Sequence, residues 1–190
     1  MAIVKSNAYG HDIYQFAKEM EELGADYLAV DSIVEGEALR KHGIKSPILV
    51  LGYTLPEKFV NAYKHNLALT VSHKEGLLML DNSHVRFHLK IDTGMHRQGF
   101  TPQEIPSVLS FLKKHKIPIG NFEGLYTHFA AAKNPAFPKD TREQTDQFKT
   151  VVELVEKAGY SPIKHAAASS GTLLFPDTHF DLVRIGISLY

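Results

Sequence analysis

One lysine, Lys5, ends a short apolar segment, AIV, and is followed at once by the stretch SNAYGH. In a barrel of alternating strands and helices, a residue at the C-terminal end of a strand lies at the catalytic mouth. Partial burial lowers the proton affinity of an amine and makes it nucleophilic enough to form a Schiff base with an aldehyde cofactor. For an isolated lysine a surface position just past a strand would be the better interpretation. The polar residues at the other strand ends favour a catalytic position for Lys5.

Polar residues follow the later apolar runs in the same way. The predicted mouth receives Lys90 with Asp92, then His128, Ser169, and Arg184 with Gly186. The loops after the last two strands, AASSG and RIGIS, occupy the usual phosphate position of a barrel. There the Ser169 hydroxyl and the backbone amides near Gly186 and Ile187 can open a helix N-terminus that favours a phosphate dianion.

The order of elements predicts how these residues are brought together. Eight apolar, β-rich runs alternate with amphipathic helical segments, at residues 2–4, 27–30, 47–51, 67–71, 85–91, 122–129, 163–167 and 181–185. Parallel strands joined by helical crossovers predict an α/β fold, a (β/α)₈ TIM barrel, with a doubly wound open sheet as the alternative. Such a barrel usually takes ~250 residues, so we expect residues 1–190 to be one barrel domain truncated at both ends.

Composition narrows the functional classes. The 21 lysines and arginines balance 21 aspartates and glutamates, which argues against recruitment of nucleic acid or an anionic membrane. The chain has no cysteine and no apolar run of about 20 residues, so we expect a soluble, cytoplasmic protein without thiolate metal sites. The histidines other than His128 show no metal-ligand spacing, and we expect no metal and a surface position for them.

Four segments resemble the N-terminal barrel of the alanine racemases, which are pyridoxal-phosphate enzymes. They are VKSNAYGHD, HLKIDTGMHRQGF, GLYTHFAAA and HAAASSGTLLFPDTHFDLVRIGISLY, in the family's order and across essentially the whole chain. The resemblance implies the cofactor pyridoxal 5'-phosphate and the interconversion of L- and D-alanine, which supplies D-alanine for peptidoglycan. It also implies a homodimer and a second, β-rich domain that carries a catalytic tyrosine.

By this resemblance each site residue has a role. Lys5 holds the cofactor aldehyde, and the phosphate is bound by Tyr9, Ser169, Gly186 and Ile187. Leu51 packs against the cofactor ring. The catalytic group, besides Lys5, consists of Arg184 at the pyridine nitrogen, His128 beside that arginine, and Arg97 facing the phenolic oxygen. Lys90 matches a lysine that is often carbamylated to hold that last arginine; an ion pair with Asp92 is an equally good interpretation.

Two residues depart from the family pattern. Ala168 replaces an asparagine common before the serine, and His96 replaces a glycine in the DTGMGR form of the second motif. Both are expected beside phosphate or substrate, so they affect substrate choice more than reaction class. Two other functions stay open: a single-domain pyridoxal-phosphate carrier, which has no use for Arg97, and a non-catalytic or phosphosugar-binding barrel, which leaves Lys5 and Arg184 unexplained.

Overall fold

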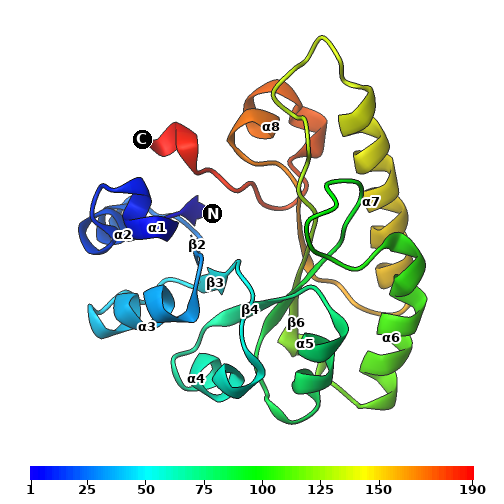
Figure 1. Cartoon of the computed structure of the whole chain (residues 1–190), viewed down its shortest axis with the longest axis horizontal. Coiled ribbons are helices and arrows are strands. Elements are labelled where there is room, and N and C mark those ends of the chain that lie inside the picture. The colour runs from blue at the N-terminus through cyan, green and yellow to red at the C-terminus, as the bar shows by residue number, and fades with distance from the viewer.

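The computed structural model describes residues 1–190, apart from the side chain of Asn82. Seven parallel strands form one sheet: β1 (Ala2–Ile3), β2 (Leu28–Val30), β3 (Ile48–Val50), β4 (Ala68–Val71), β5 (Phe87–Lys90), β6 (Phe122–Tyr126) and β7 (Ile163–His165). The strands lie side by side in sequence order from β1 to β7. The sheet is curled, and the helices lie around its outside (Figure 1).

Each crossover contains at least one helix. The α-helices are α1 (Lys5–Tyr9), α2 (Ile13–Glu22), α3 (Ile33–Lys41), α4 (Phe59–Lys64), α5 (Lys74–Met79), α6 (Ile105–Lys114), α7 (Lys139–Lys157) and α8 (Ser169–Leu174). Short 3₁₀ turns span Pro56–Lys58, Leu80–Asn82, Pro102–Glu104, Ile119–Asn121, Pro176–Thr178 and Ile187–Leu189. None of the described helices combines the length and the apolar character that crossing a membrane requires.

The predicted eighth strand over 181–185 is wrong in its extent. Arg184 forms a single parallel bridge to Ala168, and Ile185 forms one to Ala2. The ladder stays this short for two reasons. On one side β1 offers only two residues, and on the other the chain turns into α8 directly after Ala168. These bridges nevertheless join the two ends of the sheet. What the structure shows is therefore a curled seven-stranded parallel sheet, with residues 184–185 in the eighth position.

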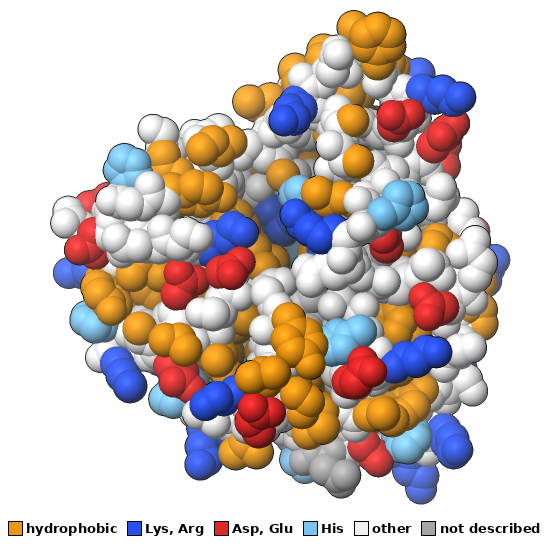
Figure 2. All heavy atoms as spheres, viewed as in Figure 1, with side chains coloured by type: hydrophobic (Ala, Val, Ile, Leu, Met, Phe, Trp, Pro, Cys, Tyr) orange, Lys and Arg blue, Asp and Glu red, His pale blue; other side chains and the backbone are white. Residues whose placement is uncertain are grey.

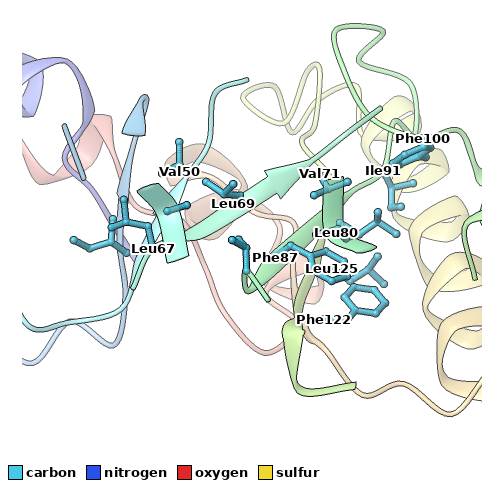
Figure 3. Packing of buried hydrophobic residues seen from close by; sticks show 14 of the residues in the cluster. Val50, Leu67, Leu69, Val71, Leu80, Phe87, Ile91, Phe100, Phe122 and Leu125 are labelled. Atoms are coloured by element: carbon cyan, nitrogen blue, oxygen red, sulfur yellow. The ribbon is translucent and has the colours of Figure 1, made fainter. Parts of the chain in front are cut away.

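Alternate residues of each strand face opposite sides of the sheet. The outward side chains pack against the helices and form the main core. Figure 3 shows part of it, with Leu69 and Val71 of β4 near Phe87 of β5 and Leu125 of β6. The inward face differs along the sheet. Near β1 to β4 it is mostly apolar, with a second cluster that includes Ile3, Ala29, Leu49 and Ala68, and Thr70 is the buried polar residue there. From β5 onward it carries buried polar residues, whose arrangement decides the site.

Several helix boundaries coincide with residues that cap helices. Ser32 Oγ accepts the Glu35 N–H at the start of α3, and Glu104 accepts the Thr101 N–H and hydroxyl before α6. Gly43 and Gly159 take left-handed conformations, φ 87° and 92°, just after α3 and α7. Only glycine adopts these angles without strain, which explains why the helices end there.

Candidate active site

The residues predicted at the strand ends meet in one cavity of about 490 Å³ at the C-terminal edge of the sheet. All ten predicted site residues line it: Lys5, Tyr9, Leu51, Lys90, Arg97, His128, Ser169, Arg184, Gly186 and Ile187. Figure 2 shows Lys and Arg side chains gathered around a hollow near the middle of one face. The sequence-based grouping of these residues is therefore matched by their positions, and their roles stay predictions.

Lys5 is presented by an unusual backbone turn. Residues Ser6 to Tyr9 all have φ between 52° and 56°, so α1 turns left-handed after its first residue. This conformation costs roughly 1–2 kcal/mol per non-glycine residue, and such strain persists only where neighbours hold it. The Glu35 carboxylate accepts the N–H groups of Ser6 and Asp31 at 2.7 and 2.8 Å. The turn thus directs Lys5 toward the cavity, where its Nζ lies 3.3 Å from Asp31 Oδ1.

Arg184 is buried at the cavity wall, with 3% of its surface exposed. Nη1 donates to His165 Nδ1 at 2.7 Å, and Nη2 donates to the carbonyls of Thr127 and Ala166, both at 2.8 Å. Burial lowers the pKa of Arg184 to about 10, so the guanidinium stays charged near neutral pH. An arginine has five N–H donors. The Nε–H and one Nη1–H have no partner among the described residues and are available to a ligand.

His128 lies beside Arg184, as predicted. Its Nδ1 is 3.2 Å from Arg184 Nη2, whose two N–H groups already donate to the carbonyls of Thr127 and Ala166 at the shorter distance of 2.8 Å. Burial, together with the positive charges of Arg184 and Arg97, lowers the pKa of His128 to about 3. The side chain is therefore a neutral imidazole.

Lys90 has only 3% of its surface exposed, and its amine lies 5.7 Å from the centre of the Tyr126 ring. Burial and the charges of Arg97 and Arg184 lower its pKa to about 8. The Asp92 carboxylate does not reach it within ion-pair distance. Asp92 Oδ1 instead accepts three backbone N–H groups of its own turn, each at 3.0 Å. The expected alternative, a lysine neutralised by Asp92, is not what the structure shows.

The predicted phosphate residues form a second group in the cavity. Ser169 Oγ accepts the Gly186 N–H at 3.0 Å, and the turn Ile187–Leu189 begins directly after this glycine. The Ile187 N–H has no acceptor among the described residues. A Cβ on Gly186 would lie 3.3 Å from the Tyr9 hydroxyl and 3.4 Å from Ile3 Cβ. Glycine thus permits the close approach of Tyr9 and leaves two hydroxyls and an N–H together.

Sequence reasoning missed three residues here. Asp31 follows β2, and its position directly after an apolar run was a usable signal. Tyr126, the last residue of β6, lies under Arg184, with 5.1 Å from the guanidinium to the ring centre. His165 ends β7 and is fully buried, as is His88 in β5, so the expectation that all histidines except His128 lie at the surface is wrong. Nothing in the spacing of these histidines distinguishes them from exposed ones.

The cavity carries an excess of positive charge in a chain whose formal net charge is zero. Its lining includes four cations, Lys5, Lys90, Arg97 and Arg184, against one carboxylate, Asp31. Pyridoxal phosphate fits these donors. Lys5 would hold its aldehyde, the free N–H groups of Arg184 would donate to the ring nitrogen, and the group at Gly186 would bind the phosphate. A phosphate dianion and the carboxylate of an amino acid would balance the excess charge.

Comparison with known proteins gives the family. The family model described as "Alanine racemase, N-terminal domain" matches residues 1–190. The chain belongs to this family. It is 39% identical over its whole length to alanine racemase 1 of Oceanobacillus iheyensis, of which it covers 52%, and 40% identical to the alanine racemase of Leptospira interrogans, of which it covers 49%. The chain therefore spans about half the length of these relatives.

Solved structures agree with the sequence comparison. The alanine racemase of Clostridium difficile 630 superposes with a TM-score of 0.89 at 34% identity. The Bacillus anthracis enzyme, whose structure is described with bound L-Ala-P, superposes with a TM-score of 0.90 at 36% identity. Both matches cover all of this chain and 50% of the other. The curled sheet is thus the fold of the N-terminal part of these enzymes.

Proposed function

We propose that this chain is the cofactor-binding domain of an alanine racemase that uses pyridoxal 5'-phosphate. The carrying observation is that Lys5, Arg184 and the group around Gly186 line one cavity, with spare donors where an aldehyde, a ring nitrogen and a phosphate would lie. The whole protein would interconvert L- and D-alanine in the cytoplasm, supply D-alanine for peptidoglycan and act as a homodimer. The fold it completes would be a (β/α)₈ barrel, joined through residues 184–185.

The cofactor and the cavity residues would contribute different parts of the chemistry. Pyridoxal phosphate, when bound, supplies an electron-withdrawing ring that acidifies the α-proton of an attached amino acid. Arg184 is charged at any ordinary pH, so it would donate to the ring nitrogen and disfavour its protonation. A less electron-withdrawing ring limits side reactions such as transamination. This suits an enzyme that only moves a proton from one face of the substrate to the other.

Racemisation needs a proton donor or acceptor on each face. With the cofactor bound, Lys5 Nζ would be the base on one face. The second base would be the tyrosine of the β-rich domain that the family resemblance implies. His128, a neutral imidazole, and Arg184, a charged guanidinium, lie side by side in the cavity wall. Arg97, exposed at the cavity rim, is placed to meet an anionic oxygen.

The test measures proton exchange on the two faces of the substrate separately. The purified chain, loaded with pyridoxal phosphate, is incubated in D₂O with L-alanine or with D-alanine, and both α-deuteration and chirality are followed. We expect slow deuteration of one enantiomer and little of the mirror form, because general acid-base catalysis by one side chain typically contributes ~10² to 10⁴ in rate. The Lys5→Ala variant is the control and should lose the exchange. A carrier would bind cofactor and exchange neither enantiomer, and full racemisation would show that both bases lie within this chain.

A further inference from the structure

Arg184 is a buried cation without a carboxylate partner among the residues that the structure describes. Buried charges are usually paired, because an unpaired one loses several kcal/mol of hydration. Two carbonyls and the face of Tyr126 offset part of this cost. Of its two histidine neighbours, His128 lines the cavity and His165 leads away from it into the closed interior of the sheet.

The hydrogen bonds beyond Arg184 have one possible direction. The guanidinium donates to His165 Nδ1, so the proton of neutral His165 is on Nε2. That nitrogen lies 2.8 Å from His88 Nδ1, which must then accept, and the proton of His88 is on its own Nε2. Burial lowers the pKa of both imidazoles, which keeps each of them neutral. Two neutral rings with aligned dipoles therefore follow one positive charge.

A carboxylate lies at the far end. His88 Nε2 is fully buried, has no hydrogen-bond partner among the described residues, and lies 3.7 Å from Glu123 Oε2. Glu123 also accepts from Tyr27 at 2.7 Å and pairs with Arg86 at 2.6 Å. Burial raises the pKa of Glu123, but its interactions with His88, Tyr27 and Arg86 outweigh this and bring it to about 2. Glu123 is therefore an anion at the N-terminal end of β6, opposite the cavity.

The backbone is shaped around this arrangement. Phe87 pairs with Phe122 and His88 pairs with Gly124, so Glu123 is the extra residue of a bulge in β6. A bulge re-aims a side chain that regular pleating would turn to the other face. Gly124 lies directly against the His88 ring, where any Cβ would collide with Nδ1. Tyr126 stacks on His165 with ring centres 4.7 Å apart and planes 7° apart, which fixes the plane of that imidazole.

We propose that His165 and His88 form a directed relay that couples the Arg184 guanidinium to the Glu123 carboxylate, and that His88 and Glu123 are positioning residues for Arg184. The aligned imidazole dipoles stabilise the positive charge at one end and the negative charge at the other. The relay engages Nη1 with His165, which leaves the Nε–H without a partner among the described residues and available to a ligand. The consequence for a bound ring nitrogen rests on the proposed function, whereas the relay itself does not.

The first experiment needs no variant. Nitrogen-15 NMR of the histidine-labelled chain reports which ring nitrogen carries the proton. We expect His165 and His88 to be neutral and protonated on Nε2 between about pH 6 and pH 8, where an unperturbed histidine would titrate. A proton on His165 Nδ1, or a charged His165 in this range, overturns the relay.

Three variants test the coupling. His88→Asn keeps an acceptor near the Nδ1 position, His88→Leu removes it, and Glu123→Gln removes only the charge. We expect exchange of the Arg184 guanidinium protons with solvent to accelerate about tenfold in His88→Leu, as for loss of one hydrogen bond, and less in His88→Asn. Glu123→Gln should keep the tautomers and still accelerate the exchange. His84→Asn is the matched control, because His84 is exposed and has φ 51°, which asparagine tolerates.

The outcomes separate the two proposals. Wild-type exchange in both His88→Asn and Glu123→Gln would refute the coupling even if His88→Leu does not fold. With pyridoxal phosphate bound, the same two variants should shift the cofactor absorbance, while His84→Asn should not. A chain that shows the expected tautomers and exchange but binds no pyridoxal phosphate would refute the proposed function and support the relay.

Discussion

Replacing Gly186 with alanine is the most direct test of the residues that are predicted to bind the phosphate. The new Cβ would lie 3.3 Å from the Tyr9 hydroxyl, which is closer than most Cβ contacts allow. Tyr9 is 41% exposed, so its ring can move away at little cost to the fold. The φ of Gly186, −126°, is combined with a ψ of −94°, which lies outside the main regions open to residues with a Cβ. We therefore expect Gly186→Ala to displace the hydroxyl and to add a local backbone strain of about 1–3 kcal/mol.

The expected loss equals one hydrogen bond to a charged acceptor, about 1.5–3 kcal/mol. Because 1.4 kcal/mol corresponds to a factor of ten, the Kd for pyridoxal phosphate should rise about 10- to 100-fold. Tyr9→Phe should cause a similar rise, and the double variant should lose about as much as either single variant, since both remove one contact. Absorbance titration gives the Kd. Thermal unfolding of Tyr9→Phe should shift by no more than about 4 °C, the change expected for 1 kcal/mol in a chain of this size.

Pyridoxal, which lacks the phosphate, provides the control ligand for this experiment. If the group at Gly186 binds phosphate, neither Gly186→Ala nor Tyr9→Phe should change the affinity for pyridoxal. An equal loss for both ligands would show that the two variants damage the cavity as a whole and would refute the assignment. Additive losses in the double variant would show that Tyr9 and Gly186 act separately, against the 3.3 Å contact.

Three further outcomes are expected. Borohydride reduction in the presence of pyridoxal phosphate should attach the cofactor to Lys5, and peptide mapping that finds it on another lysine would reject that role. Lys90→Met should raise the free energy of unfolding at pH 7 by up to about 3 kcal/mol, because the pKa of Lys90 falls from 10.5 to about 8 on folding. Between these two pH values the unfolded chain binds more protons, so the wild type gains stability as pH rises and the advantage of the variant disappears; denaturant titrations across that range check the sign. In bicarbonate the neutral Lys90 amine should take up carbon dioxide and pair with Arg97, visible as a ¹³C carbamate signal, and a bare amine at pH 8 and above would remove this idea.

Strand ends were the most informative feature of the sequence. Parallel strands in one sheet bring their C-terminal ends to one edge, so an apolar run followed by a polar residue places that residue near the others. This argument placed Lys5, Lys90, His128 and Arg184 correctly. It was less successful at the eighth position, where the length of pairing depends on the two-residue β1 and on the turn into α8. Local sequence contains neither constraint.

The left-handed turn after Lys5 also could not be predicted from the sequence. Ser6 to Tyr9 contain no glycine, and a propensity argument gives no reason for four consecutive positive φ values. The conformation depends on Glu35, 29 residues away from Ser6, whose carboxylate accepts the Ser6 N–H. Ser32 and Glu35 have the Ser-x-x-Glu spacing of a capping box. Only the serine half forms, because the glutamate caps the Lys5 turn and the Asp31 N–H instead.

The buried polar residues on the inner face of the sheet show why the alternation of polar and apolar residues along a strand does not by itself reveal such a site. In the segment FHLK of β5, Phe87 and Leu89 pack outward against the helices, whereas His88 and Lys90 point inward. In an open antiparallel sheet the same pattern would place the histidine and lysine in solvent. Here the sheet curls, so its polar face becomes the interior and each polar group needs a partner or a ligand. His88 finds a hydrogen-bond partner in His165, while Lys90 faces the cavity, and the closure of the sheet thereby turns an ordinary alternating strand into one wall of a binding site.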